Sequence, residues 1–271
     1  MKKEIIYDFG ANNGDDIPYY LLKSDHVVAV EANPVLCEQI KNRFSSEIKK
    51  GRLKVENYVI TAAENSEEVV FYIHKENHIL GQFPKPPEDQ LIFFDEILLP
   101  SKPVAQIIKE HGAPHYIKID IEHYDSEILR ALSINDIYPP FISAETHSID
   151  VFCLLVTMGY DAFKLIDGHT VSKVYKDRII QVGEDHTLYS FPHHSAGPFG
   201  SDIDGKWMTA DNFFRLLALE GLGWKDIHAS RIESPDPSIK RSLKEIFSKV
   251  VMAKIRDIYR RTITLLRLSK G

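Results

Sequence analysis

The sequence has few of the features that mark secreted or membrane-spanning proteins. Only two cysteines, Cys37 and Cys153, occur among its 271 residues, and they lie far apart, so a disulfide framework is not expected. No apolar stretch approaches the roughly 20 residues that a membrane-spanning helix needs. After Met1-Lys2-Lys3 come a short apolar run and an acidic turn, and not the hydrophobic segment of a signal peptide. We therefore expect a cytoplasmic protein.

Acidic residues outnumber basic residues over most of the chain, and only the C-terminal end has an excess of basic residues. Residues 238–271 hold ten lysines and arginines and two acids, a formal charge of +8, whereas the whole chain carries −6. The other 237 residues therefore carry −14. Because contacts between basic residues and phosphates dominate nucleic-acid affinity, we expect no nucleic-acid partner for this acidic body.

Residues 236–271 are predicted to form a basic amphipathic C-terminal helix. Its apolar stripe comprises Ile239, Leu243, Ile246, Phe247, Val250, Val251, Ile255 and Ile258. Such a helix is typical of proteins that contact a membrane surface, here the inner membrane face, or an acidic partner. Alternatively, the stripe docks on the chain's own acidic body or on a second subunit, which the opposite charges favour.

The chain also lacks the GxGxxG fingerprint of dinucleotide-binding folds. Residues 8–14 read DFGANNG instead, with Asp8 on the strand that precedes the first glycine. Gly10 and Gly14 allow a tight turn from a strand into a helix. A carboxylate at Asp8 repels a pyrophosphate but attracts the ammonium ion of an amino-acid-like ligand. S-adenosylmethionine carries that ammonium ion and no phosphate, so this segment predicts a methyl-donor site.

A second predicted strand, at residues 26–30, ends at Glu31 and Ala32. An acid at this place can accept hydrogen bonds from both ribose hydroxyls of a nucleotide. NAD-binding folds use the same device, so Glu31 alone does not separate the two cofactors. The alternative is that Glu31 only caps the helix that begins near Pro34.

Strand and helix patterns alternate along the chain. Apolar runs predict strands at residues 5–7, 26–30, 52–59, 68–73, 115–122, 141–144 and 160–166, with a further strand within 181–191 completing the sheet. Helical patterns occupy 35–48, 104–111, 126–132, 149–158 and 209–219, and the proline-containing segment 78–96 is predicted to be a loop. This alternation predicts an α/β fold with a mostly parallel sheet and helices on both faces.

Polar residues gather where the predicted strands end. They are Asp8, Glu31, Asp120, Glu122, Glu145 and His147. Ligands of such sheets bind outside the carboxyl ends of the strands, so we expect these side chains to converge on one crevice. Asn12 and Asn13 either adopt left-handed turn conformations or contact the donor. The predicted donor-binding residues are Asp8, Gly10, Asn12, Asn13, Gly14, Glu31, Ala32, Asn57, Val59 and Asp120, where Asn57 and Val59 would contact the adenine.

Four segments together resemble the FkbM-type family of S-adenosylmethionine-dependent methyltransferases. They are residues 8–14 (DFGANNG), 30–34 (VEANP), 116–122 (YIKIDIE) and 139–145 (PPFISAE), followed by Gly159-Tyr160. The resemblance covers about residues 4–165. It implies a class I methyltransferase (Rossmann-like) fold, whose seven-stranded sheet has an antiparallel last strand, and O-methylation, often of sugars or natural products. Where the family pattern usually has glycine after YIKIDIE, this chain has His123, which narrows the pocket or adds a functional imidazole.

Methyl transfer to a hydroxyl needs a base or a metal ion near the acceptor. The candidates are Glu122, His123, Glu145 and His147. His147 is the preferred base, although a solvated loop histidine fits the same sequence. Asp120 and Glu145 are the pair that would bind a divalent cation such as Mg²⁺, but no fixed ligand spacing is present, which favours an acid network without an ion. Lys118 is expected to pair with a neighbouring carboxylate.

The prediction divides the chain into a methyltransferase domain (1–192), a loop and helix covering the acceptor site (193–235) and the basic helix (236–271). In the long loop at residues 193–207, His193, His194 and Trp207, with Trp224 beyond it, either close over an acceptor sugar or form a surface loop anchored by Trp207.

The predicted function is an S-adenosylmethionine-dependent O-methyltransferase that acts on a sugar hydroxyl of a glycan or natural product. One alternative is an NAD(P)-dependent oxidoreductase, which the missing GxGxxG pattern opposes. The other is a non-catalytic module that keeps the fold, which the intact Asp8, Gly10, Gly14 and Glu31 oppose.

Overall fold

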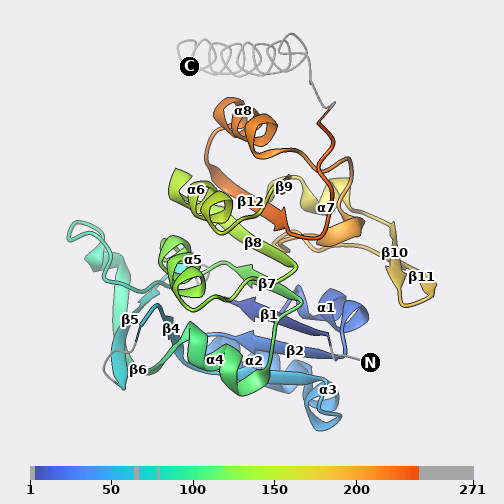
Figure 1. Cartoon of the computed structure of the whole chain (residues 1–271). Helices are drawn as coiled ribbons and strands as arrows, with labels where there is room; N and C mark the ends of the chain where they lie inside the picture. Colours follow the sequence, from blue (N-terminus) through green and yellow to red (C-terminus); the bar gives the residue numbers. More distant parts are fainter. Residues whose placement is uncertain (1–3, 64–66, 78–79, 238–271) are drawn as a thin grey trace, which may run out of the picture.

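A seven-stranded sheet with the order β3-β2-β1-β7-β8-β12-β9 forms the centre of the computed structural model, which describes residues 4–63, 67–77 and 80–237 (Figure 1). Its strands are β1 (Ile5–Phe9), β2 (His26–Val30), β3 (Leu53–Glu56), β7 (Tyr116–Ile119), β8 (Phe141–Thr146), β9 (Ala162–Asp167) and β12 (Gly223–Ser230). Neighbouring strands run parallel except for β12, which is antiparallel to both β8 and β9. The predicted mostly parallel seven-stranded sheet with an antiparallel last strand is confirmed.

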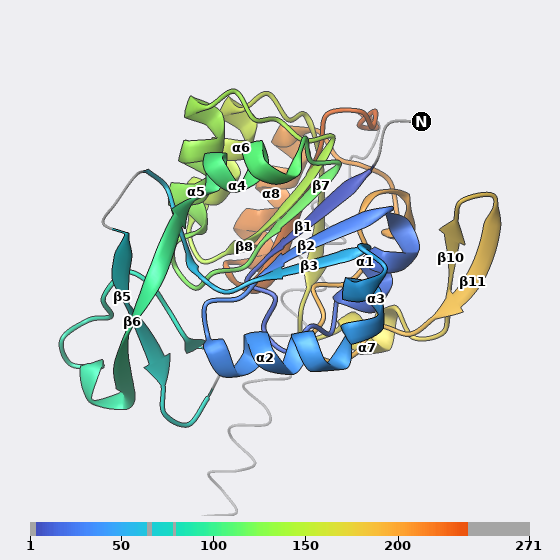
Figure 2. The ribbon, with the colours of Figure 1, turned by 90° about the horizontal axis from the view of Figure 1, so that it is seen from below.

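Helices cover both faces of this sheet (Figure 2). One face carries α1 (Ile17–Lys23), α2 (Pro34–Arg43), α3 (Ser45–Lys49) and α7 (Val171–Val174), and the other carries α4 (Val104–His111), α5 (Asp125–Ile134), α6 (Ile149–Thr157) and α8 (Ala210–Glu220). Successive strand residues point to opposite faces, so Ile6 joins the apolar cluster under α1 and α2 while Tyr7 joins the one under α4 and α5. Every residue of β1 is buried, as expected for a strand covered on both sides.

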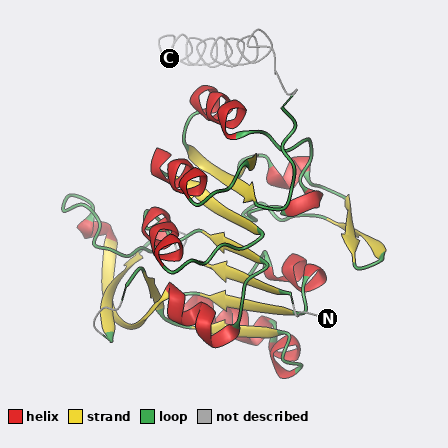
Figure 3. Cartoon of the chain, in the orientation of Figure 1, coloured by secondary structure: helices red, strands yellow, loops and turns green. Residues whose placement is uncertain are grey.

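Two smaller sheets flank the central one (Figure 3). The first contains β4 (Val59–Thr61), β6 (Phe94–Pro103) and β5 (Glu68–His74), with a 3-10 turn η2 (Leu91–Phe93) before β6. The single strand predicted at 52–59 is therefore wrong: Asn57 and Tyr58 separate β3 and β4, which enter different sheets. The loop predicted at 78–96 ends early, because β6 begins at Phe94 and pairs with β5. The helix predicted at 35–48 is interrupted at Phe44, which ends α2 and precedes α3.

The strand expected within residues 181–191 does not complete the central sheet. Strands β10 (Arg178–Val182) and β11 (Asp185–Tyr189) form a separate two-stranded hairpin. Its turn contains Gly183, which has a φ of +61°. The seventh place in the central sheet belongs to β12, whose sequence does not read as a strand because Asp226 and His228 interrupt the apolar run. Both side chains are buried in the sheet.

The C-terminal part of the described chain adds one short 3-10 turn, η3 (Gly200–Asp202), and helix α8. The predicted helix at residues 209–219 is confirmed: the side chain of Thr209 accepts a hydrogen bond from the backbone of Asn212 and caps α8. No helix within the described residues is long and apolar enough to cross a membrane. The predicted basic helix lies almost entirely in residues 238–271, outside the described part of the chain.

Candidate active site

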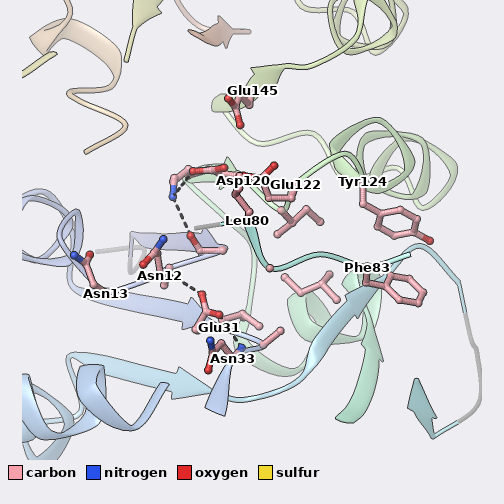
Figure 4. A pocket seen from close by; sticks show the side chains of 18 of the residues that line it. Asn12, Asn13, Glu31, Asn33, Leu80, Phe83, Asp120, Glu122, Tyr124 and Glu145 are labelled. Carbon is pink, nitrogen blue, oxygen red and sulfur yellow. Dashed lines mark hydrogen bonds and ion pairs between the residues drawn. The ribbon is translucent and has the colours of Figure 1, made fainter. Parts of the chain in front are cut away.

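A cavity of 540 Å³ lies at the carboxyl ends of β1, β2, β7 and β8 (Figure 4). The predicted site residues in its wall are Gly10, Asn12, Asn13, Glu31, Ala32, Val59, Asp120, Glu122, Glu145 and His147. The parallel strands bring them together because their carboxyl ends meet at one edge of the sheet. Four predicted residues do not line this cavity, namely Asp8, Gly14, Asn57 and His123.

The turn after β1 depends on left-handed backbone conformations. Gly10 has a φ of +82°, and a Cβ atom here would lie 1.8 Å from the carbonyl oxygen of Asp120, so only glycine fits between the two loops. Asn12 has a φ of 48°, which confirms its predicted turn conformation. The side-chain oxygen of Asn13 accepts a hydrogen bond from the backbone two residues ahead. Direct contact of either asparagine with a donor stays a prediction.

Glu31 is held at the cavity wall by backbone hydrogen bonds. Its Oε2 accepts from the Asn12 N–H at 2.7 Å, and its Oε1 accepts from the Asn33 N–H at 2.8 Å. Burial raises the pKa of Glu31 to about 7, although these two hydrogen bonds oppose the rise. The capping role considered for Glu31 is wrong, because the side chain of Asn33 caps α2 by accepting from the Val35 N–H at 3.0 Å.

Asp8 lies beneath the cavity and not in its wall. Its side chain has no exposed area, and its Oδ1 is 3.2 Å from Lys118 Nζ. Lys118 also lies 3.3 Å from Asp120 and donates to the Gly10 carbonyl at 3.1 Å. Burial opposes the charge on Lys118, but the surrounding carboxylates raise its pKa well above the usual range. The expected pairing of Lys118 is confirmed, whereas direct contact of Asp8 with the donor's ammonium ion is wrong, because the Asp8 side chain is fully buried and does not line the cavity.

The side of the cavity next to the three-stranded sheet is apolar. Its residues are Tyr58, Val59, Ile60, Phe71, Leu80, Phe83, Ile121 and Tyr124. Phe83 and Tyr124 pack edge to face, with ring centroids 5.2 Å apart (Figure 4). The sequence predicts only Val59 among them, since nothing local places β5 and the following loop beside the cavity. Asn57 lies outside this wall and donates to the carbonyls of Glu31 and Ala32, both at 2.8 Å, against its predicted contact with the adenine.

A cluster of acids and histidines faces the other part of the cavity. His147 lies between two carboxyl groups: its Nε2 is 3.7 Å from Glu122 Oε2, and its Nδ1 is 3.5 Å from Glu145 Oε2. Burial, and then His123, lower the pKa of His147, so the imidazole is neutral at pH 7. Burial, and then the charge of Asp120, raise the pKa of Glu122 to about 7. The same two causes raise the pKa of Glu145 to about 10.

The backbone under this cluster explains the glycine of the family pattern. Glu122 and His123 have φ values of 37° and 65°, both left-handed. Glycine adopts this conformation freely, whereas other L-residues are destabilised in it by roughly 1–2 kcal/mol. His123 is exposed, and its ring centroid lies 4.5 Å from that of His147. The extra imidazole therefore borders the cluster and does not narrow the cavity.

Two overlapping groups offer donor atoms for a cation. One contains Glu122, His123 and His147, the other contains Asp120, Glu122 and Glu145, and in each group the atoms lie within 4.8 Å of one another. The pair predicted for Mg²⁺, Asp120 and Glu145, falls in the second group. Carboxylate and imidazole donors fit divalent ions.

The two tryptophans, Trp207 and Trp224, have different environments. Trp207 is 6% exposed, packs against Phe141 and lies under the ammonium group of Lys164. It anchors its loop and does not line the cavity, but residues 195–200 of this loop are buried, so the predicted surface loop is wrong. Trp224 lines the cavity with His194, whose ring stacks on it at a centroid distance of 5.8 Å. Closure of these two side chains over an acceptor stays a prediction.

The strand order, with its antiparallel β12, and the cavity at the carboxyl ends of the parallel strands define a class I methyltransferase fold. The chain belongs to the FkbM methyltransferase family: the family model described as "Methyltransferase FkbM domain" matches residues 8–152, more than half of the chain.

Solved structures of several methyltransferases and of a spermidine synthase are similar to this chain. A methyltransferase FkbM from Methylobacillus flagellatus KT is 19% identical with a TM-score of 0.41, and the match covers 61% of this chain and 40% of that one. A precorrin-6y C5,15-methyltransferase from Geobacter metallireducens GS-15 is 12% identical with a TM-score of 0.34, covering 69% and 74%. The spermidine synthase of Thermotoga maritima is 10% identical with a TM-score of 0.37, covering 89% and 58%. No curated protein matches the chain.

Proposed function

We propose that the protein transfers the methyl group of S-adenosylmethionine to a hydroxyl oxygen of a sugar, in a glycan or a natural product. The observation that carries this proposal is the acidic lining of the cavity wall. It has six carboxyl side chains and one lysine: Asp15, Asp16, Glu31, Asp120, Glu122, Glu145 and Lys118. Such a cavity attracts the sulfonium and ammonium ions of the donor and repels the pyrophosphate of NAD(P).

The donor is proposed to lie along the loops that follow β1, β2 and β7. Glu31 accepts the ribose hydroxyls, and the adenine lies against the apolar wall at Val59 and Phe71. Asp120 takes the role predicted for Asp8, because its side chain is 38% exposed and lines the cavity. It meets the donor's ammonium ion, and Lys118 beside it meets the donor's carboxylate.

In the transfer, the acceptor oxygen bonds to the methyl carbon while the carbon–sulfur bond breaks, and the bonding pair stays on sulfur. The donor is already activated, so the site has to position the acceptor and remove its hydroxyl proton. The Glu122–His147 pair removes this proton, because a carboxyl with a pKa of about 7 and a neutral imidazole both accept protons near neutral pH. Glu145, on the other ring nitrogen of His147, orients the imidazole.

The acceptor is proposed to enter beside His194 and Trp224. Aromatic faces pack on the apolar faces of sugar rings, which supports a sugar as the group that carries the hydroxyl. The basic sequence of residues 238–271 fits an acceptor presented at the inner membrane face.

Calorimetric titration with S-adenosylmethionine, in EDTA and in Mg²⁺, tests the donor assignment. We expect micromolar binding by the wild type and no comparable binding of NAD(P). Glu31→Gln should weaken donor binding roughly 10- to 100-fold, since hydrogen bonds to a charged group contribute about 1.5–3 kcal/mol. Glu38→Gln, on the exposed side of α2, is the matched control. Absence of donor binding, or tighter binding of NAD(P), would contradict the proposal.

A further inference from the structure

We infer that Glu122, His123 and His147 bind one divalent transition-metal ion, with its open coordination positions facing the cavity. His147 Nε2 and Glu122 Oε2 are 3.7 Å apart, and one donor atom of each of the three residues lies within 4.8 Å of the others. Two ligands that are each about 2.1 Å from an ion lie about 3–3.5 Å from one another. Small side-chain rotations therefore bring the three donors onto one ion.

Glu145 provides an independent observation for this site. It is 7% exposed, and its only polar side-chain contact within the described residues is His147 Nδ1, a buried atom that itself has no hydrogen-bond partner there. Its carboxyl group points toward the side of the cavity where Asp120 and Glu122 lie (Figure 4). A metal-bound histidine almost always donates its second ring N–H to a carboxylate or carbonyl, which fixes the ring. His147, with Glu122 at Nε2 and Glu145 at Nδ1, has this arrangement.

The chemistry of the donor atoms indicates which of the two candidate groups binds an ion and which kind of ion it binds. In the all-carboxylate group, Asp120 already contacts Lys118 at 3.3 Å, so a cation there competes with the lysine ammonium. Imidazole ligands suit zinc, iron, nickel and copper, whereas Mg²⁺ prefers carboxylates and water. Two histidines and one glutamate therefore favour a transition metal over the Mg²⁺ considered from the sequence.

This inference rests on the proposed function and refines its chemistry. A hydroxyl bound to such an ion has a lower pKa than in water. With Glu122 and His147 holding the ion, the ion would take over the role proposed above for that pair, and the proton of the ion-bound hydroxyl would leave to solvent at the cavity mouth. Glu145 becomes a positioning residue that holds the ring of His147.

The test is a titration of the EDTA-treated full chain with Co²⁺, whose visible absorption reports its ligands, and then with Zn²⁺ and Mg²⁺. We expect one Co²⁺ or Zn²⁺ per chain and much weaker Mg²⁺ binding. Glu145→Gln should lower Co²⁺ affinity roughly 10- to 100-fold, and His147→Ala by more. His186→Ala, on the exposed hairpin of β10 and β11, should leave it unchanged.

The variant His123→Gly distinguishes the loss of a metal ligand from a loss of metal affinity caused by misfolding. Glycine suits the φ of 65° at this position, so this variant should unfold at or above the wild-type temperature and still lose Co²⁺ affinity. Titration of the same EDTA-treated samples with S-adenosylmethionine separates the two proposals. If the protein binds S-adenosylmethionine but these variants leave its Co²⁺ affinity unchanged, the metal site alone is overturned. Co²⁺ binding without donor binding overturns the proposed function alone.

Discussion

Replacing Lys118 by methionine tests how the charges beneath the cavity are balanced. Lys118 Nζ lies 3.2 Å from Asp8, 3.3 Å from Asp120 and 3.9 Å from Asp16, and the lysine side chain is 4% exposed. Methionine is similar in length and carries no charge. Lys118→Met therefore leaves Asp8 and Asp16 buried without a positive partner.

The expected loss of stability is large. Removing one partner of a buried ion pair costs roughly 3–5 kcal/mol, against a total unfolding free energy of about 5–15 kcal/mol. For a protein of this size, each kcal/mol shifts the Tm by about 2–4 °C, so the Tm should fall by about 6–20 °C at pH 7. The matched control is Lys54→Met, because Lys54 is 52% exposed and pairs with Glu56 at the surface. Its loss should be about 0–1 kcal/mol.

The pH dependence gives this prediction a second readout. Burial raises the pKa of Asp8, and raises that of Asp16 to about 6 from an ordinary value of 3.8. Above 3.8 the folded state keeps protons that the unfolded state releases, so these groups lower stability as pH rises. Without Lys118 both pKa values rise further, so the deficit of Lys118→Met should shrink between pH 7 and pH 5. Urea unfolding at both pH values measures it. A deficit at pH 7 no larger than that of Lys54→Met would refute the reasoning.

Three further predictions concern the cavity and its surroundings. Gly10→Ala places a Cβ atom 1.8 Å from a backbone oxygen, so it should destabilise the protein far more than Gly51→Ala. At Gly51 the space is open, and alanine costs only the roughly 1–2 kcal/mol of a left-handed backbone conformation. Urea unfolding of both variants compares the two losses of stability. The affinity for S-adenosylmethionine should fall as pH drops below about 7, by at most about tenfold per pH unit, because the ribose hydroxyls favour the ionised form of Glu31. Calorimetry should show that the affinity of Glu31→Gln does not change with pH. If the affinity of this variant depends on pH as that of the wild type does, the effect belongs to another group. Trp207→Ala should lose about 3–5 kcal/mol of stability, whereas Trp224→Ala should lower acceptor turnover with little change in Tm, and equal thermal shifts would contradict the different roles of the two rings.

The elements that the sequence predicts correctly are those whose signals are local. Strand β2 (His26–Val30) and helix α4 (Val104–His111) have the predicted bounds, because an apolar run or a helical period is followed directly by a residue that ends it. Strand β12 has no such signal. It places Asp226 and His228 inside the sheet, where pairing with β8 and β9, distant in sequence, determines its structure. Local propensity does not predict an element that tertiary pairing imposes.

The same distinction applies to the site. Residues that directly follow parallel strands, such as Glu31 and Asp120, are predictable, because topology alone brings the strand ends to one edge. Whether such a side chain reaches the cavity is not predictable: Asp8 is buried beneath the cavity, where it pairs with Lys118. The apolar wall at Phe71 is also not predictable, since it depends on how a second sheet packs beside the first.

His123 connects a departure from the family pattern with the backbone beneath it. Glu122 and His123 are both left-handed, which costs roughly 1–2 kcal/mol for each L-residue, and glycine at position 123 would remove one of these costs. Backbone strain of this kind persists where function or the surrounding structure requires it. Nothing packs the exposed His123 into the core, and its ring borders His147, so we expect the residue to be kept for its imidazole. His123→Gly should then gain stability and lose methyl transfer, and a variant that gains stability at full activity would show that the imidazole has no part in the reaction.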